Sequence, residues 1–326
     1  MMPETMARSS KIMLKSIRLI VVFRGETKEC RCKNKFADLL IIYNITTEID
    51  FKLTINSTAI SNINQSIVLI TGAASGIGRL LALESARKGA SHVIVVDKNK
   101  EGGNRVCEEV IGMGGKAVFI YADLSSKDSI SEALSLIHST FTHIDILINN
   151  AGIVTGKAFI DHSNEEIERT INVNLLACML FTKGLLQAMM SRRSGHIVNI
   201  ASSAGMAAHP KLSVYVASKW GVIGWSESLR LELEQEKTGV RVTTVTPYYI
   251  DTGMFSGVKS PIIPLLKPAS VSKKIIVAIE KNKIFSRMPW IVYAIPFVKG
   301  IMPQRWFDFI LGKVFRIYSS MDSFKG

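Results

Sequence analysis

Residues 66–78 read S-I-V-L-I-T-G-A-A-S-G-I-G, a short apolar run that leads directly into three glycines. The run is rich in β-branched residues, which favours a strand buried on both faces. The segment Arg79–Lys88 then carries a helical pattern in which Leu80, Leu83 and Ala86 should face inward. We therefore predict a strand, a glycine turn and a helix, a unit whose helix N-terminus can bind a diphosphate.

The glycines are spaced G-x-x-x-G-x-G rather than G-x-G-x-x-G, so their interpretation depends on the residues that come after them. A second apolar strand is predicted over His92–Val96, and Asp97 ends it about 20 residues after the glycines. A carboxylate there can accept hydrogen bonds from the adenosine ribose and repels a ribose phosphate. With Ser75, not a basic residue, before the second glycine, we expect NAD rather than NADP, although Lys98 or Arg79 could pair with a phosphate.

A tyrosine and a lysine stand four residues apart in Y-V-A-S-K, at Tyr215 and Lys219. On a helix this spacing puts both side chains on one face. The neighbouring cation should lower the pKa of the tyrosine from its ordinary value of about 10. Ser202 follows a predicted strand, His196–Ala201, at the end where parallel sheets bind ligands. Hydride transfer at a carbinol carbon needs a proton moved at its oxygen, and these side chains can move it.

Further motifs occur in order along the chain. They are N-N-A-G at Asn149–Gly152, N-V-N-L at Asn172–Leu175 and N-I-A-S-S at Asn199–Ser203. With the glycine stretch and Y-V-A-S-K, they resemble the motif set of the short-chain dehydrogenases/reductases from about Ile67 to about Phe255. The resemblance implies an α/β fold of the Rossmann type, with a doubly wound parallel sheet in a single domain.

Apolar runs between the motifs agree with that alternation. Strands are predicted over residues 117–121, 144–148 and 240–246, and helices over 104–111, 129–141, 165–190 and 225–236.

The resemblance also implies roles for individual residues. Tyr215 would be the acid or base, and Lys219 would bind the nicotinamide ribose and tune Tyr215. Ser202 would hydrogen-bond the substrate oxygen, with Ser203 as the neighbouring alternative, and Asn174 would hold a water in a proton relay. The implied cofactor contacts are Thr71, Gly72, Ser75, Gly76, Ile77, Gly78, Asp97, Asp123, Leu124, Asn150, Ala151, Gly152, Tyr215, Lys219, Pro247, Ile250 and Thr252.

The chain departs from the family pattern after the strand predicted over residues 240–246. The usual Pro-Gly is replaced by Pro247-Tyr248-Tyr249. The T-G-M-F at residues 252–255 and the C-terminal M-D-S-F-K-G resemble the subgroup of epidermal retinol dehydrogenases and lipid-droplet 17-beta-hydroxysteroid dehydrogenases. Losing the glycine leaves less room beside the nicotinamide. Tyr248 and Tyr249 either line an apolar substrate slot or fill the core.

Composition narrows the choice of partners. The 326 residues include 40 Lys and Arg and 27 Asp and Glu, a net charge of +13 at pH 7. No basic motif of a nucleic-acid reader accompanies this charge, so we expect no nucleic acid and favour an anionic membrane surface. The four cysteines are few and scattered, which suits a reducing compartment, and we assign no metal.

The composition of the two ends differs from that of the central part, so we predict three regions. We expect a poorly defined extension over 1–65, a dehydrogenase domain over 66–283 and an amphipathic aromatic tail over 284–326. The apolar runs Ser16–Phe23 and Ala37–Tyr43 of the extension are short, and neither has the order of a signal peptide.

The tail interleaves basic and aromatic residues, and Pro289, Pro296 and Pro303 should break it into short helices. None of its apolar stretches reaches the ~20 residues that span a bilayer. We therefore expect it to lie in a membrane interface, to cover the substrate cleft, or to do both.

Three functions stay open. The first is NAD-dependent oxidation of a lipophilic secondary or allylic alcohol, retinol-like or steroid-like, at the cytosolic face of the endoplasmic reticulum or a lipid droplet, or else in the cytoplasm. The second is an NADP-dependent carbonyl reductase. The third, a catalytically silent lipid-surface scaffold, is opposed by the intact catalytic set. The family also implies a homo-oligomer, although no residue pattern sets the number of subunits.

Overall fold

The computed structural model describes residues 19–23, 26–30, 61–258, 260, 263–322 and 324. It divides the chain into two compact units, Met1–Ala59 and Ile60–Gly326. In the first unit, strands Leu19–Phe23 (β1) and Glu26–Cys30 (β2) pair antiparallel. The apolar run expected over Ala37–Tyr43 lies outside the described residues.

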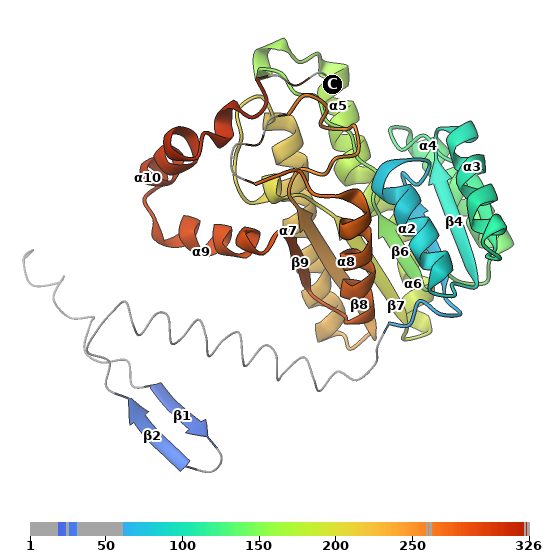
Figure 1. Cartoon of the computed structure of the whole chain (residues 1–326). Coiled ribbons are helices and arrows are strands. Elements are labelled where there is room, and N and C mark those ends of the chain that lie inside the picture. The colour runs from blue at the N-terminus through green and yellow to red at the C-terminus, as the bar shows by residue number, and fades with distance from the viewer. Residues whose placement is uncertain are drawn as a thin grey trace, which may run out of the picture. The chain divides into compact units, whose positions relative to one another are not determined.

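The second unit is built on a parallel sheet (Figure 1). Its described strands run in the order β5-β4-β3-β6-β7-β8-β9. The order reverses beside β3, which pairs with β4 on one side and β6 on the other. Ligands of such sheets bind outside the carboxyl ends of the strands at this reversal. The strands are Ile67–Thr71 (β3), His92–Asp97 (β4), Ala117–Tyr121 (β5), Ile146–Asn149 (β6), Gly195–Ile200 (β7), Val240–Pro247 (β8) and Phe285–Met288 (β9).

Helices cover both faces of this sheet. One core cluster joins the sheet to α2, α3 and α8, and a second joins it to α4, α6 and α7. The helices are Gly76–Arg87 (α2), Lys100–Gly112 (α3), Lys127–Thr140 (α4), Asn164–Ile171 (α5), Ala177–Ser191 (α6), Ser213–Gln235 (α7), Pro268–Glu280 (α8), Ala294–Ile301 (α9) and Gln304–Phe309 (α10). The doubly wound parallel sheet expected from the sequence is confirmed.

Strand β3 is apolar from Ile67 to Ile70 because both of its faces are covered. Along β3, Val68 and Ile70 belong to the cluster with α2, α3 and α8, whereas Leu69 belongs to the opposite cluster. A strand covered on both faces needs a continuous apolar run rather than alternation. The interpretation of residues 66–70 as such a strand is confirmed.

The inward face of α2 differs from the expected one. The helix begins at Gly76 and buries Ile77, Leu81 and Leu83, whereas Leu80 and Ala86 are only half-buried. Its first turn packs directly against the glycine turn, and this contact fixes the rotation of the helix. Apolar spacing alone does not determine that rotation.

One other helix, α7, is longer than expected, and the long helix predicted over residues 165–190 is present. α7 begins at Ser213 rather than Trp225, and it places Tyr215 and Lys219 on one buried face. The long helix predicted over residues 165–190 is present as α5 and α6, joined by a π-helical turn at Asn172–Leu176.

By length and composition alone, the span Asn164–Ser191 could cross a membrane. In this structure Phe181, Leu185 and Met189 of the same span are buried against the sheet. A core helix of a globular fold satisfies the same test of length and apolarity, so the span carries no conclusion about membranes.

Both expected domain boundaries fall inside the second compact unit. Ile63 lies in the core although residues 1–65 were expected as an extension. The boundary after residue 283 precedes β9, which pairs with β8 and completes the sheet. In the tail, Pro296 lies in the first turn of α9, where proline is tolerated, and does not break the helix as expected.

A buried histidine sits at the N-terminal end of β7. His196 Nδ1 lies 2.8 Å from Ser61 Oγ, and its Nε2 lies 2.8 Å from Thr243 Oγ1. Burial, with the charge of nearby Arg241, lowers the pKa of His196 to about 3. The imidazole is therefore neutral in the folded protein at neutral pH and in mild acid.

We predict that His196 makes the fold acid-sensitive. An unfolded histidine titrates near pH ~6.5, so below that pH the unfolded state binds a proton that the folded state does not. Stability should fall by about 1.4 kcal/mol per pH unit as the pH drops. Between pH about 7.5 and about 5, urea unfolding should show the wild type losing about 2 kcal/mol more than His196→Gln. Equal losses in the two proteins would contradict this assignment.

Candidate active site

The turn after β3 packs against the turn after β6 at the carboxyl edge of the sheet. Gly72 has φ +64°, and a Cβ there would lie 2.6 Å from Ala151 Cα, so only glycine fits. A Cβ on Gly78 would collide with the Gly72 carbonyl. Gly76 also has positive φ, but a Cβ there would meet only Thr252, at 3.6 Å. Gly72 and Gly78 are therefore required where backbone segments pack closely, whereas there is room for a Cβ beside Gly76.

Side chains of the two turns hold them together. The Thr71 hydroxyl accepts hydrogen bonds from the N–H groups of Asn150 and Ala151, at 3.1 and 3.2 Å. Asn150 Nδ2 donates to the carbonyls of Thr71 and Gly72, both at 3.0 Å. Ser75 makes no side-chain hydrogen bond to the first turn of α2. The N–H groups there border the cavity uncapped, so they are placed to bind phosphate oxygens.

The carboxylate of Asp97 is fixed at the end of β4. Its Oδ2 accepts a hydrogen bond from the Ala74 N–H at 3.0 Å, and its Oδ1 accepts one from the Asn99 N–H at 2.9 Å. Arg79, which the sequence left as a phosphate partner, is instead paired with Glu109 on α3. Lys98 follows Asp97 and lines the cavity, so it could still pair with a ribose phosphate.

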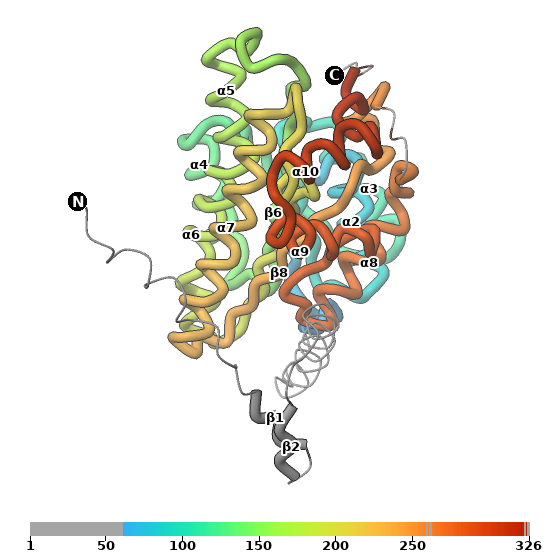
Figure 2. Tube along the Cα trace, turned by 90° about the vertical axis from the view of Figure 1, so that its left-hand side faces the viewer, coloured from blue at the N-terminus to red at the C-terminus, as the bar shows by residue number. Residues whose placement is uncertain are grey.

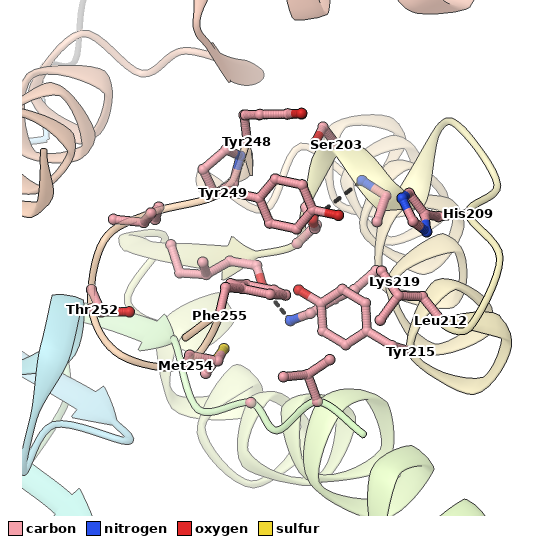
Figure 3. A pocket seen from close by; sticks show the side chains of 18 of the residues that line it. Ser203, His209, Leu212, Tyr215, Lys219, Tyr248, Tyr249, Thr252, Met254 and Phe255 are labelled. Carbon is pink, nitrogen blue, oxygen red and sulfur yellow. Dashed lines mark hydrogen bonds between the residues drawn. The ribbon is translucent and has the colours of Figure 1, made fainter. Parts of the chain in front are cut away.

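Ser202, Tyr215 and Lys219 come together beyond the carboxyl end of β7. Figure 3 shows Tyr215 and Lys219 side by side, with Ser203 nearby. The Ser202 hydroxyl lies near enough to Tyr215 to lower the pKa of the phenol, and Ser202 Oγ accepts a hydrogen bond from the Ala204 N–H at 3.2 Å. Lys219 Nζ donates to the Ile200 carbonyl at 2.9 Å and lies 5.8 Å from the centre of the Tyr215 ring. Tyr215 is only 5% exposed. The spacing in the sequence thus brings these three groups into one site.

The pKa of Tyr215 is opposite to the sequence expectation. Burial raises it to about 12, and Ser202 offsets only part of that rise. Burial also lowers the pKa of Lys219. The expected lowering is therefore wrong for the protein alone, because desolvation of the phenolate is the largest influence on the pKa of Tyr215 and Lys219 is not among the causes of its shift. Tyr215 holds its proton at neutral pH.

Asn174 lies in the π-helical turn between α5 and α6 and is fully buried. Its Oδ1 accepts from the Ile153 N–H at 2.8 Å, while its Nδ2 donates to the Ile153 carbonyl at 2.9 Å and to Ser218 Oγ at 3.0 Å. The side chain thus holds the segment after Gly152 in place. Its role in a water relay stays a prediction.

A cavity of about 830 Å³ runs from the glycine turn past Tyr215 to the tail. Thr71 and Asn174 do not reach its wall in the described part of the chain. The other expected site residues all line it. They are Gly72, Ser75, Gly76, Ile77, Gly78, Asp97, Asp123, Leu124, Asn150, Ala151, Gly152, Ser202, Ser203, Tyr215, Lys219, Pro247, Ile250 and Thr252.

The aromatic pair after β8 both lines the cavity and fills the core beside it. Tyr249 is 9% exposed and packs edge-on against Tyr248 and Phe255, with ring centres 4.8 and 4.9 Å apart. Phe255 in turn meets the Tyr215 ring edge-on at 6.0 Å. Both alternatives left open by the sequence therefore hold for Tyr249.

Much of the cavity wall is formed by residues that the sequence motifs did not identify. The inner sides of α9, α10 and their flanking turns contribute Val292, Ile295, Val298, Phe307 and Leu311, and the loop before α7 contributes His209 and Leu212. Figures 1 and 2 show this tail beside the β9 edge of the sheet. Its aromatic composition was visible in the sequence, but which residues face the cavity was not.

Comparisons with known proteins agree with this geometry. The family model described as short chain dehydrogenase matches residues 66–262. Epidermal retinol dehydrogenase 2 of Homo sapiens is 38% identical over 268 residues, covering 81% of this chain and 86% of that protein. Short-chain dehydrogenase/reductase 3 of Homo sapiens is 31% identical over 268 residues, covering 81% and 88% of the two chains.

Solved structures share the fold. A short-chain dehydrogenase from Sphingobium yanoikuyae in complex with NADPH has a TM-score of 0.65 at 28% identity, covering 70% of this chain and 90% of that one. A short chain dehydrogenase/reductase from Burkholderia phymatum in complex with NAD has a TM-score of 0.66 at 21% identity, covering 72% and 92%. The family model, the relatives and the glycine turn with its Ser-Tyr-Lys group lead to one conclusion: the chain belongs to the short chain dehydrogenase family.

Proposed function

We propose that this protein oxidises a lipophilic alcohol with NAD. Family membership and the site make the chain an NAD(P)-dependent oxidoreductase. The observation that carries the proposal is the meeting of Ser202, Tyr215 and Lys219 on the wall of a cavity that also contains the glycine turn and Asp97. The nicotinamide cofactor supplies the hydride chemistry when bound. The protein supplies binding, orientation and the proton.

The residues divide this work among themselves. Ser202 can hydrogen-bond the substrate oxygen because it already stands beside Tyr215 Oη. Tyr215 exchanges a proton with that oxygen. Lys219, 5.8 Å from the Tyr215 ring, stabilises the phenolate that forms when the proton leaves. The first N–H groups of α2 would bind the cofactor diphosphate, and Asp97 would accept hydrogen bonds from a ribose.

The preference for NAD rests on Asp97 and on the pairing of Arg79. A carboxylate held rigidly by two backbone N–H groups repels a ribose phosphate, and Arg79 is already neutralised by Glu109. Solved structures of similar chains contain either NAD or NADP(H), so likeness alone does not choose between the two coenzymes.

The substrate class is inferred from the wall of the cavity. Apart from the catalytic groups, its outer part is lined by apolar side chains of the tail, such as Val298, Phe307 and Leu311. Similar proteins are named retinol dehydrogenases, among them Retinol dehydrogenase 10 of Rattus norvegicus at 35% identity. We infer a long, lipophilic alcohol of the retinol or steroid kind.

Reduction of the corresponding carbonyl is the second candidate. The raised pKa of Tyr215 favours it, because a protonated phenol is ready to donate to a carbonyl oxygen. The same residues serve both directions. A catalytically silent scaffold is not favoured, since the catalytic groups are assembled.

The outer side of the tail suggests contact with a membrane or lipid droplet. Trp290 is 79% exposed and Trp306 is 64% exposed, and Phe309 and Val314 are also exposed. Basic residues accompany them at Arg305, Lys313 and Arg316. Aromatic residues favour the headgroup region and basic ones favour anionic lipid. We infer that this side lies against a lipid surface, which would let a lipophilic alcohol enter the cavity beneath it.

Removing the phenol should stop turnover. Tyr215→Phe deletes the proton donor or acceptor, and we expect kcat to fall by about 10³-fold or more while the Kd for NAD changes by less than about threefold. Tyr121→Phe, which changes an exposed tyrosine on β5, is the matched control. Steady-state kinetics and cofactor titration measure both quantities. Retained turnover in Tyr215→Phe would exclude this mechanism.

Neutralising Asp97 should relax the choice of coenzyme. In Asp97→Ala and Asp97→Asn the repulsion of a ribose phosphate is gone, so the ratio of kcat/KM for NAD over NADP should fall by about tenfold or more. Asp128→Asn, on α4, serves as the control. A wild type that already prefers NADP would refute the assignment of NAD, and an unchanged ratio in both variants would refute the role of Asp97.

Changing the outer tail should weaken lipid binding. Replacing Trp290, Trp306 and Phe309 together by serine removes exposed aromatic surface, and we expect co-sedimentation with anionic phosphatidylserine vesicles to fall by about tenfold. Replacing the exposed Ile111 and Leu136 of α3 and α4 by serine is the control. If both proteins sediment like the wild type, the tail is not the lipid contact.

A further inference from the structure

Residues 317–322 and Phe324, which we call the clasp, pack beside the catalytic tyrosine. Met321 is 2% exposed and shares a cluster with Leu212, Tyr215 and Tyr249, against which Phe324 also packs. Met321 and Phe324 do not line the cavity themselves, whereas Leu212 and Tyr249 do. Ile317 of the clasp also lines the cavity, so the clasp contributes one residue to the wall and supports it from behind with Met321 and Phe324.

One glycine shows how closely the clasp is seated. A Cβ on Gly156 would collide with the ring of Phe324 and would lie 2.6 Å from Met321 Cε. Gly156 belongs to the loop that follows Gly152 at the cofactor side of the cavity. The clasp thus joins this loop to the α7 side of the site, and a side chain at position 156 forces the Phe324 ring and the end of Met321 to shift.

Polar contacts hold the clasp at its other end. His209 is 9% exposed, and its Nε2 lies 2.8 Å from the Ile317 carbonyl and 2.9 Å from Ser320 Oγ. Tyr249 Oη lies 3.3 Å from the same Ser320 Oγ. Lys211 Nζ pairs with Asp322 at 2.7 Å on the surface, where an ion pair adds little. His209 is thus the buried side chain that contacts both the backbone and a side chain of the clasp.

The contacts continue from the clasp to the catalytic group. Ser320 touches Tyr249, the Tyr249 ring packs on Phe255 at 4.9 Å, and Phe255 packs on Tyr215 at 6.0 Å. Figure 3 shows Tyr249, Phe255 and Tyr215 close together at the pocket, with His209 to one side. A displaced clasp would release this wall and admit water to Tyr215.

We propose that the clasp is a positioning element of the active site: seated by His209 and on Gly156, it holds Tyr249 and Leu212 in place and closes the catalytic end of the cavity against water. Its effect on the environment of Tyr215 can be measured without substrate. Its effect on substrate binding rests on the function proposed above.

The titration of Tyr215 reports whether water reaches it. The groups that face its ring and hydroxyl are Lys219, Ser202, Phe255 and Tyr249, and Lys219 is the charged one among them. Because burial is the main cause of the raised pKa, a hydrated Tyr215 should titrate closer to the ordinary value of about 10.

Three variants of the full-length protein displace or remove the clasp. Gly156→Leu pushes it out, His209→Leu removes its hydrogen bonds, and a chain ending at Arg316 lacks it. Gly112→Leu is the matched control, because a Cβ at Gly112 on α3 meets nothing within 4 Å. Circular dichroism and thermal melting establish which variants are folded.

The measurement is tyrosinate absorbance against pH in cofactor-free protein, each variant being compared with the same variant carrying Tyr215→Phe. In the wild type and Gly112→Leu the difference signal should be absent below pH about 11, whereas in the clasp variants it should appear near pH about 10. A folded chain ending at Arg316 that titrates like the wild type overturns the proposal. If that chain does not fold, wild-type titration in both Gly156→Leu and His209→Leu overturns it.

Kinetics with retinol give a second readout. The wall contacts substrate and transition state alike, so the clasp variants should raise KM by about tenfold. An unchanged KM in a folded chain ending at Arg316 overturns the binding role. If the wild type turns over no alcohol at all, the proposed function fails, while the titration still decides the clasp.

Discussion

The close approach of two backbone turns, Gly72 after β3 and Ala151 after β6, is the constraint on which the site depends. These strands are neighbours in the sheet, and their connections leave in opposite directions. The turns touch so closely that a single Cβ on Gly72 would overlap Ala151. Thr71 and Asn150 lock this contact with hydrogen bonds. The uncapped start of α2 is held at the resulting cleft, where a phosphate can meet its N–H groups.

Burial then determines what the catalytic group can do. Tyr215 and Lys219 lie on one face of α7, but the packing of Leu212, Tyr249 and Phe255 around them removes water. Desolvation disfavours both charged forms, so it raises the pKa of the phenol and lowers that of the ammonium. The protein alone thus holds a protonated tyrosine beside a serine hydroxyl. From that state Tyr215 can donate a proton to a carbonyl oxygen, whereas it must first lose its own proton before it can accept one from an alcohol.

Local sequence patterns predicted much of the fold and the cleft. The apolar runs identified the central strands because a sheet covered on both faces buries most of their residues. The motifs identified many residues that line the cavity, from the glycine turn to Lys219, but not others such as Arg169 and Val173. The features that the patterns could not predict depend on contacts between distant segments. The face of α2 is set by its packing on the glycine turn, and the pKa of Tyr215 is set by burial under residues far along the chain. The tail was recognisable as amphipathic, yet its inner wall and the contacts of His209 with Ile317 and Ser320 have no local signal.

Oxidation of a lipophilic alcohol with NAD can be tested by monitoring reduced-cofactor absorbance while purified protein is offered retinol, a hydroxysteroid and ethanol, each with NAD and with NADP. We expect turnover with NAD and a lipophilic alcohol, and little with ethanol, because the outer cavity wall is apolar. Turnover of ethanol as efficient as that of retinol, or no turnover by protein that binds NAD, would contradict this proposal.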